Sequence, residues 1–388
     1  MYPDPAVRKV LIYRVGSLGD TIVALPSFHL IARAFPNAER VLLSENPQHA
    51  KATPASALLK GAGLIHGDMR YPGATRNLGD ILRTLLEIRR YRPDVVVHLM
   101  PRFSAKATRR DALFFRLAGV RRIVGTIDKG SMKHGFDAAT GLHEPYASLL
   151  ARSIAELGDA DPSNIANWDL HLSAAEKDTA RQVLAPLEGK PLIVCGPGTK
   201  MQTKDWGQDN WQALIGRLYS RFPNYGLVTI GVEQESQICD FASLPWAGSK
   251  VNLAGKLSPR ESAAVIAHAE VFIGPDSGPM HLASSVGVPS VCVFSSIGLP
   301  GEMYPFGSRN RVIYHRVECM GCHLLECIEM KKKCILSITV DEMESAILAV
   351  LSNTDEPAPA SFAGHSLGGQ LIHETAIAPA TGDCASQS

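Results

Sequence analysis

The feature of this sequence that most constrains its fold is the alternation of short β-branched runs with longer segments of helical periodicity. In the first half, the expected buried strands are Val10–Tyr13, Val41–Ser44, Val95–Leu99 and Arg122–Gly125. The segments between them with apolar residues at helical spacing are Thr21–Phe35, Asn77–Tyr91, Ala105–Leu117 and Pro145–Leu157. Pro26 is expected to kink the first of these helices or to mark its first turn.

The second half repeats this alternation. Its expected strands are Leu192–Cys195, Leu227–Ile230, Val271–Ile273 and Ser290–Phe294, and its expected helices are Trp211–Phe222, Ser258–His268, Pro279–Val286 and Thr339–Leu351. Parallel strands with intervening helices form sheets that are covered on both faces. The sequence therefore predicts an α/β protein with two doubly wound, Rossmann-like domains.

The length of 388 residues exceeds what one hydrophobic core normally organises and fits roughly two domains. We expect an N-terminal domain over residues 1–165 and a C-terminal domain over residues 185–351. Beyond residue 353 the composition turns to Ala, Pro, Ser, Gly and Thr, so residues 353–388 are expected to form a disordered tail.

No uncharged apolar run approaches the roughly 18–20 residues that a membrane helix needs. The N-terminus carries Asp4 and two prolines where a signal peptide would need an apolar core. These observations favour a cytoplasmic protein.

A loop with two glycines, residues 14–20, follows the first strand and ends in Asp20. Ligands of open α/β sheets bind at the carboxyl ends of strands, where such glycines let the backbone approach a ligand closely. Asp20 could be a catalytic carboxylate, or it could cap the free N–H groups at the start of the helix. The glycine spacing is not that of a dinucleotide fingerprint, which disfavours a nicotinamide site.

A matching loop, residues 274–281, follows a strand in the second half and opens a helix. It contains Asp276, Ser277 and Gly278, and His281 follows one turn into the helix. Free N–H groups and a hydroxyl at a helix N-terminus can bind a phosphate. The alternative is an N-cap with a histidine packed against the sheet.

Two further loops of the second half carry polar residues at strand ends. Residues 196–206 contain Thr199, Lys200 and Lys204, which suit a diphosphate but lack the ending of an ATP-binding P-loop. Glu233 and Glu235 follow the strand that ends at residue 230, and either carboxylate could bind ribose hydroxyls or be a solvated helix start.

Charge is distributed unevenly along the chain. The overall net charge is +1, but residues 70–133 hold 15 Lys/Arg against 5 Asp/Glu, a local balance of +10 that leaves −9 for the rest. Such asymmetry favours an anionic partner for one domain over arginines that are simply solvated.

Four of the eight cysteines, Cys319, Cys322, Cys327 and Cys334, fall within 16 residues. Four thiolates suffice for a tetrahedral zinc or iron site, and the first pair has a metal-ligand spacing. The later spacings are unusual for such a site, so reduced thiols in a loop are the alternative.

Four short motifs of this sequence are specific enough to compare with known protein families. They are residues 16–20 with Leu25 and Pro26, Lys204 with Trp206 and Trp211, residues 276–278 with His281, and Pro289 after Gly287. In these elements the chain resembles glycosyltransferase family 9, which contains the ADP-heptose:lipopolysaccharide heptosyltransferases, over about residues 9–351. The resemblance implies a GT-B fold, in which two domains face a central cleft. It also implies an inverting transfer that needs no metal for catalysis.

The resemblance further implies roles for the loop residues. Asp20 would be the general base, and the acceptor would lie in the N-terminal half near Gly19. The residues implied for the nucleotide-sugar donor, with ADP-heptose favoured, are Thr199, Lys200, Lys204, Glu233 (or Glu235), Asp276, Ser277, Gly278 and His281.

The basic stretch falls in the implied acceptor half. We expect Arg102, Lys106, Arg109 and Arg110 to contact an anionic, lipid-linked saccharide such as a lipopolysaccharide core. Such an acceptor would bring the protein to the inner face of the cytoplasmic membrane, and no nucleic acid is expected as a partner. In some relatives a similar cysteine-rich insertion binds iron.

Three departures from the family pattern leave the sugar open. Gly207 stands where many relatives have proline, and the insertion over residues 319–334 and the long tail are absent from the simplest heptosyltransferases. The alternatives are an enzyme like the nucleotide-sugar epimerases, a protein-modifying heptosyltransferase, or a non-catalytic binding subunit with the same fold.

Overall fold

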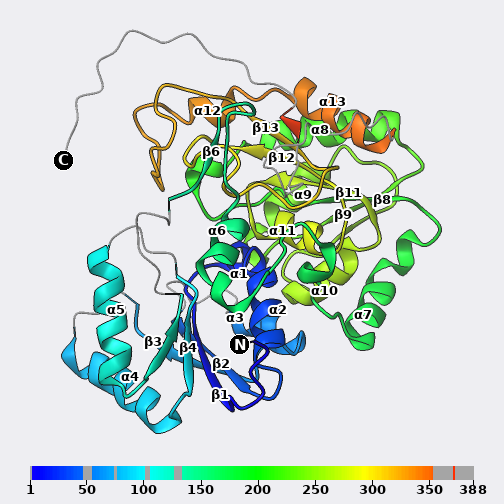
Figure 1. Ribbon diagram of the computed structural model, residues 1–388. Coiled ribbons are helices and arrows are strands. Elements are labelled where there is room, and N and C mark those ends of the chain that lie inside the picture. The colour runs from blue at the N-terminus through cyan, green and yellow to red at the C-terminus, as the bar shows by residue number, and fades with distance from the viewer. Residues whose placement is uncertain are drawn as a thin grey trace.

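The computed structural model describes residues 2–46, 55–73, 77–100, 105–125 and 133–352, and the backbone of residues 370–371. Figure 1 shows two domains, the first in blue and cyan and the second mainly in green, yellow and orange. Each contains one parallel sheet with helices on both faces, as the alternation in the sequence predicts. No helix in the described ranges is long and apolar enough to cross a membrane.

The N-terminal sheet has five parallel strands in the order β3-β2-β1-β4-β5. They are β1 (Lys9–Tyr13), β2 (Glu39–Glu45), β3 (Gly67–Tyr71), β4 (Val95–His98) and β5 (Arg122–Val124). The helices of this half are α1 (Leu18–Ile22), α2 (Leu25–Ala34), α3 (Ala55–Gly61), α4 (Leu78–Tyr91), α5 (Ala105–Leu117) and α6 (Tyr146–Ser153).

The two faces of this sheet pack against different helices. On one face Ile22 of α1 and Phe28 of α2 join a core that continues into the C-terminal domain. On the other face Ile88 of α4 and Phe115 of α5 complete a separate, smaller core. Helices α4 and α5 therefore lie together on the side of the sheet opposite to α1.

The expected helix over residues 21–35 consists of two helices instead. α1 begins at Leu18 and ends at Ile22, and α2 begins at Leu25 with Pro26 in its first turn. Proline suits this position because its missing N–H has no partner within the helix there. The break confirms that Pro26 marks a first turn, and it leaves α1 as a short helix beside the loop that contains Asp20.

An antiparallel hairpin of β6 (Phe136–Asp137) and β7 (Leu142–His143) precedes α6. The C-terminal sheet has the order β10-β9-β8-β11-β12-β13-β14, with all strands parallel. They are β8 (Leu192–Cys195), β9 (Gly226–Thr229), β10 (Lys250–Asn252), β11 (Ala269–Pro275), β12 (Ser290–Phe294), β13 (Arg311–Tyr314) and β14 (Gln370–Leu371). Apart from β14, the tail predicted for residues 353–388 lies outside the described residues.

The helices of the second half are α7 (Ala174–Leu184), α8 (Gln208–Arg221), α9 (Ser236–Ser243), α10 (Pro259–Ile266), α11 (Gly278–Ser285), α12 (Lys333–Leu336) and α13 (Val340–Leu351). α7 packs against α10, and α13 packs against α8. The segment between the sheets holds short 3-10 turns at 155–157 and 165–168. The domain boundaries at residues 165 and 185 stay a prediction.

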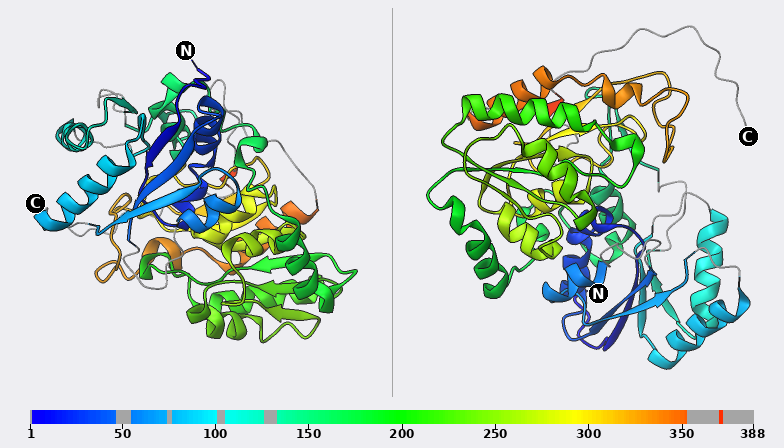
Figure 2. Two further views of the ribbon diagram at one scale, coloured as in Figure 1. Left: turned by 90° about the horizontal axis from the view of Figure 1, so that it is seen from below. Right: turned by 180° about the vertical axis from the view of Figure 1, so that it is seen from behind.

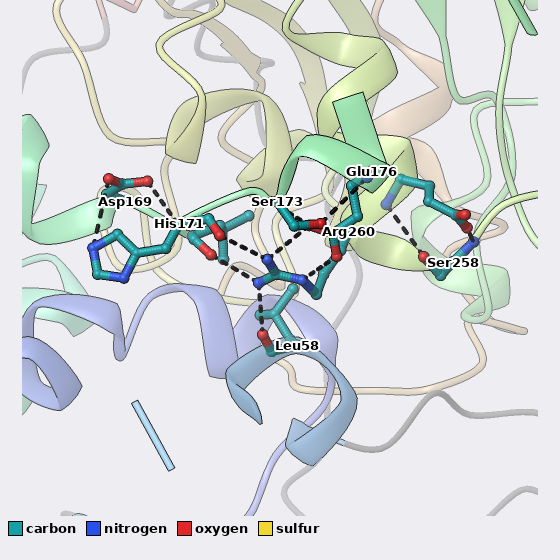
Figure 3. Close-up of polar contacts among 9 residues, drawn as sticks. Leu58, Asp169, His171, Ser173, Glu176, Ser258 and Arg260 are labelled. Carbon is teal, nitrogen blue, oxygen red and sulfur yellow. Dashed lines mark hydrogen bonds and ion pairs between the residues drawn. The ribbon is translucent and has the colours of Figure 1, made fainter. Parts of the chain in front are cut away.

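A buried arginine of α10 ties the two domains together (Figure 3). The Arg260 guanidinium donates to the backbone oxygen of Leu58 in α3 at 3.1 Å and to those of Leu170 and His171 in the connecting segment at 2.8 and 3.0 Å. Its Nε and Nη2 donate to the two carboxylate oxygens of Glu176 in α7 at 2.5 and 2.9 Å. All five N–H groups of the guanidinium are thus satisfied.

Candidate active site

The loop after β1 places Asp20 in the first turn of α1. Its Oδ2 accepts hydrogen bonds from the backbone N–H and the hydroxyl of Ser17, both at 2.7 Å, so the carboxylate does cap the helix. A Cβ at Gly16 would lie 2.4 Å from the Asp20 Cβ, which explains the glycine there. The second oxygen, Oδ1, makes no hydrogen bond to any described residue. Capping therefore leaves half of the carboxylate available for another partner.

Arg14, which the sequence alone did not single out as a site residue, holds this loop in place through hydrogen bonds. Its side chain is buried, and Nη2 donates to the backbone oxygen of Asp20 at 2.9 Å. Nη1 donates to the Tyr146 hydroxyl at 3.2 Å, and the guanidinium stacks on the Tyr146 ring. The available signal was the position of Arg14, a basic residue directly after a buried strand. Tyr146, on α6, carried no such signal.

The loop after β11 faces this loop from the C-terminal domain. Ser277 is the N-cap of α11, and its buried hydroxyl has no hydrogen-bond partner among the described residues. His281 lies one turn into α11 and is also buried. This is the strand–loop–helix arrangement that the sequence predicts, with Pro279 in the first turn.

Helices α1 and α11 touch across the domain boundary. A Cβ at Gly19 would lie 2.9 Å from Cδ2 of His281, and a Cβ at Gly278 would lie 2.9 Å from Cδ2 of Leu18. Both glycines therefore permit a close approach of the two domains. This contact brings together the loops of Asp20 and His281, which are 261 positions apart in the sequence.

Lys204 joins the loop over residues 196–206 to this centre. Its ammonium forms an ion pair with Asp276 at 2.6 Å, and both side chains are largely buried. Burial lowers the pKa of His281 to about 4, against the opposing effect of the Asp276 and Asp20 carboxylates and with a further lowering by Lys204. The imidazole is thus neutral near pH 7. The centre holds two carboxylates, one ammonium and one neutral histidine.

Thr199 and Lys200 lie in the same loop as Lys204, and the Lys200 side chain is exposed. Glu235 accepts a hydrogen bond from the Val232 N–H at 2.9 Å, and burial raises the pKa of this carboxyl against the effects of that bond and of Lys200. Glu233, by contrast, is exposed in the 3-10 turn over Glu233–Glu235 that follows β9. Glu235 therefore closes its own turn, whereas Glu233 is available to a ligand.

The expected acceptor residues lie on another element. Lys106, Arg109 and Arg110 are on the exposed face of α5, and Arg110 pairs with Asp111 at 2.8 Å. Since α5 covers the sheet face opposite to α1, the described contacts do not join these side chains to Asp20. Arg102 lies outside the described residues. Their role in acceptor binding stays a prediction.

The four clustered cysteines line one small cavity of about 10 Å³. All seven cysteines in the described part of the chain are free thiols. Burial raises the pKa of Cys319 and of Cys334, and the neighbouring thiols add to this effect. In their present positions, no three His, Cys, Asp or Glu side chains of the described ranges are arranged to hold a metal ion.

The sequence profile of glycosyltransferase family 9 (heptosyltransferase) matches residues 126–333. The chain belongs to glycosyltransferase family 9. A curated relative, lipopolysaccharide heptosyltransferase 3 of Escherichia coli (strain K12), is 25% identical over 299 residues, which cover 72% of this chain and 80% of the relative. Another lipopolysaccharide heptosyltransferase 3 of Escherichia coli is 32% identical over 111 residues, but there the match spans 28% of this chain and 32% of the relative.

Solved structures of the family share the fold. The family 9 glycosyltransferase of Veillonella parvula has a TM-score of 0.65 at 16% identity, over 91% of this chain and 99% of that one. The Escherichia coli heptosyltransferase WaaC has a TM-score of 0.55 at 17% identity, over 89% of this chain and all of WaaC. The expected GT-B fold and the expected family are confirmed, and the protein is a glycosyltransferase that is similar to lipopolysaccharide heptosyltransferases.

Proposed function

We propose that this glycosyltransferase moves a heptose from ADP-heptose to a lipopolysaccharide core or a related anionic, lipid-linked saccharide, with inversion at the anomeric carbon. The observation that carries the proposal is the meeting of the Asp20 loop with Lys204, Asp276 and His281 across the domain boundary. Direct displacement needs a base on one side of the sugar and positive charge on the other. WaaC, which shares the fold, has been solved with ADP and with ADP-2-deoxy-2-fluoro heptose.

In this proposal Asp20 is the general base. The Ser17 donors hold Oδ2, and Arg14 holds the Asp20 backbone oxygen, so that Oδ1 keeps a fixed direction. Oδ1 takes the proton of the acceptor hydroxyl while the hydroxyl oxygen attacks the anomeric carbon next to Gly19. The bond between this carbon and the diphosphate oxygen breaks, and ADP leaves with the electron pair.

The leaving diphosphate gains negative charge, which cations and backbone N–H groups can stabilise without a metal. Lys204 would exchange part of its ion pair with Asp276 for a phosphate oxygen, and Thr199 and Lys200 would contact the same group. Ser277 and Gly278 would add donors from the start of α11, where the Ser277 hydroxyl lacks a described partner. His281 would line this site as a neutral imidazole, and Glu233 would bind the ribose.

The acceptor would dock on the N-terminal domain. Lys106, Arg109 and Arg110, together with Arg102, would contact the anionic groups of the saccharide, since a guanidinium can bind two oxygens of one phosphate. We propose that the protein is cytoplasmic and reaches this acceptor at the inner face of the cytoplasmic membrane.

We also propose that the four cysteines hold a structural zinc or iron ion that takes no part in transfer. Their thiols line one cavity, and thiolate is a preferred ligand of both metals. Binding would require the side chains to turn toward a common point and to lose their protons. Elemental analysis of the purified full chain is expected to find stoichiometric metal, absent from Cys319→Ser and retained in Cys384→Ser. Metal-free wild-type protein would refute this part.

The reaction itself is tested by incubating the protein with ADP-heptose, with and without a core saccharide acceptor. A transferase releases ADP and a glycosylated product only when the acceptor is present. An epimerase would convert the donor sugar without an acceptor, and a binding subunit would do neither. A protein-modifying enzyme would use a polypeptide acceptor in place of the saccharide. Thermal-shift measurements across nucleoside diphosphates identify the preferred base.

A further inference from the structure

Two neighbouring helices of the N-terminal domain expose an unusual number of apolar side chains. Of the 13 large hydrophobic residues that are exposed in the described ranges, six lie on α4 and α5, a fraction too high for scattered surface residues. We call the outer surface of these helices the α4–α5 face. Its apolar and basic members are Leu78, Ile81, Leu82, Arg83, Leu86, Arg89 and Arg90 of α4 and Lys106, Arg109, Arg110, Leu113, Arg116 and Leu117 of α5. On the acidic side α4 exposes Glu87, and Asp80 pairs with Arg83 at 3.5 Å.

On α4 the apolar stripe faces solvent. Leu78, Leu82 and Leu86 recur every four residues and so share one side of the helix, where they are 80%, 55% and 42% exposed. Only Thr84 and Ile88 of this helix are buried. A surface helix normally turns its apolar stripe toward the core. In α4, by contrast, Ile88 packs into the core on the sheet, while the leucines of the apolar stripe remain exposed to solvent.

On α5 the exposed leucines lie among cations. Leu113 and Leu117 are 57% and 58% exposed, and they follow Lys106 and Arg110 at helical spacing on the same side. The single acidic residue of the helix, Asp111, is buried. The solvent side of α5 therefore combines positive charge with two apolar side chains.

The two helices form one continuous face. They pack against each other and against the same small core on the sheet. Figures 1 and 2 show both helices on the side of the N-terminal domain remote from the C-terminal domain. Residues 70–133, which include both helices, hold the local charge balance of +10.

We infer that the α4–α5 face docks onto the surface of an anionic lipid bilayer. A helix that lies in a membrane interface buries leucines at the acyl boundary while its cations meet the headgroups. The arginines can lie along the apolar surface and still reach phosphate groups. A second copy of the chain would bring equal positive charges together, and a free saccharide would leave the leucines in water.

This inference deepens the proposed function, because it names the surface through which the domain proposed to bind the acceptor reaches a lipid-linked acceptor. The same membrane that holds such an acceptor would hold the enzyme. Docking itself requires neither donor nor acceptor, so it can be tested separately.

The test measures co-sedimentation of the full chain with vesicles, without nucleotide sugar or saccharide. We expect binding to phosphatidylglycerol-containing vesicles and little binding to pure phosphatidylcholine vesicles. Binding should weaken strongly in about 1 M salt, where electrostatic attraction extends only about 3 Å. The triple variant Leu78→Gln, Leu82→Gln, Leu86→Gln should bind at least about tenfold more weakly. Leu244→Gln, at a 63% exposed leucine of the C-terminal domain, is the matched control and should bind as wild type does.

A second variant tests the charges. Arg90→Gln with Arg116→Gln removes two exposed cations and should weaken binding about tenfold or more, whereas Lys177→Gln on α7 should leave it unchanged. These positions are exposed in the structure, so circular dichroism and thermal unfolding should match wild type.

The inference is overturned if wild type does not bind anionic vesicles, or if both variants bind them as well as wild type does. It is also overturned if sedimentation without lipid shows a dimer that the leucine variant dissociates, since the face would then belong to a second copy. ADP release measured with a soluble, delipidated acceptor separates the outcomes. Loss of docking with intact transfer leaves the proposed function standing, and docking without transfer leaves the inference standing.

Discussion

Arg260 offers the sharpest test of how the two domains are held. Its side chain is 5% exposed, and its donors bind Glu176 and three backbone oxygens that come from α3 and from the segment between the domains (Figure 3). Burial alone would raise the pKa of the Glu176 carboxyl, but hydrogen bonds from Arg260 and Ser173 outweigh it, so the pKa is lowered. The pair is thus charged and well matched at neutral pH.

Replacing Arg260 by methionine keeps an unbranched apolar stem in place of the arginine methylenes and removes every donor. Glu176 loses its counter-ion, and three backbone oxygens lose a partner, of which those of Leu58 and Leu170 are buried and that of His171 is half-buried. Breaking a buried ion pair by removing one member costs about 3–5 kcal/mol. Glu176 retains the Ser173 hydrogen bonds and partial access to water, so we expect a loss of about 3 kcal/mol.

The assay is equilibrium unfolding in urea, followed both by circular dichroism and by hydrogen exchange of α3 and α10. Arg181→Met is the matched control, because Arg181 lies on α7 and pairs with Asp178 in the solvent. That change should cost at most about 1 kcal/mol. The reasoning is refuted if Arg260→Met unfolds within about 0.5 kcal/mol of wild type, a margin typical of surface substitutions.

Three further changes address the site. As the pH falls from 6.5 to about 4, the free energy of unfolding of wild type should drop by up to about 3 kcal/mol more than that of His281→Asn. The reason is that the buried imidazole, with a pKa of about 4, stays neutral in the folded protein, while the same imidazole in the unfolded chain takes up a proton near pH 6.5. Parallel stability–pH curves of the two proteins would contradict this. Gly19→Ala puts a Cβ 2.9 Å from His281 and should lower turnover at least about tenfold at a stability cost of about 1–3 kcal/mol, and undiminished turnover would show that the domains need no such approach. Arg109→Gln with Arg110→Gln should raise the acceptor KM about tenfold and leave donor affinity unchanged, whereas equal effects on both would remove these residues from the acceptor site.

The fold could be predicted to a large extent because its signals are local. The buried central strands consist of runs rich in β-branched residues, and Pro26 lies in the first turn of α2, which is one of the two outcomes expected for it. The edge strands β3 and β10 were not predicted, because edge strands are short and polar and so lack an apolar run. β3 has the sequence Gly-Asp-Met-Arg-Tyr, and β10 has the sequence Lys-Val-Asn. β13 was also missed, although its sequence carries a strand signal.

The site could be predicted loop by loop, but the way the loops meet could not. The ion pair of Lys204 with Asp276 and the contact of Gly19 with His281 depend on distances that no local pattern contains. The support of the Asp20 loop by Arg14 and Tyr146 has the same origin. Capping at Asp20, in contrast, is readable from Ser17 three residues earlier.

The central claim is that Asp20 removes a proton from the acceptor during sugar transfer. The most direct measurement is the rate of acceptor-dependent ADP release by Asp20→Asn, with Asp209→Asn, an exposed position on α8, as the control. The amide can still accept the Ser17 hydrogen bonds but cannot take up the proton. We predict a loss of turnover of about 10²–10⁴-fold with donor affinity retained, and wild-type turnover in the control. Wild-type turnover in Asp20→Asn would contradict the account.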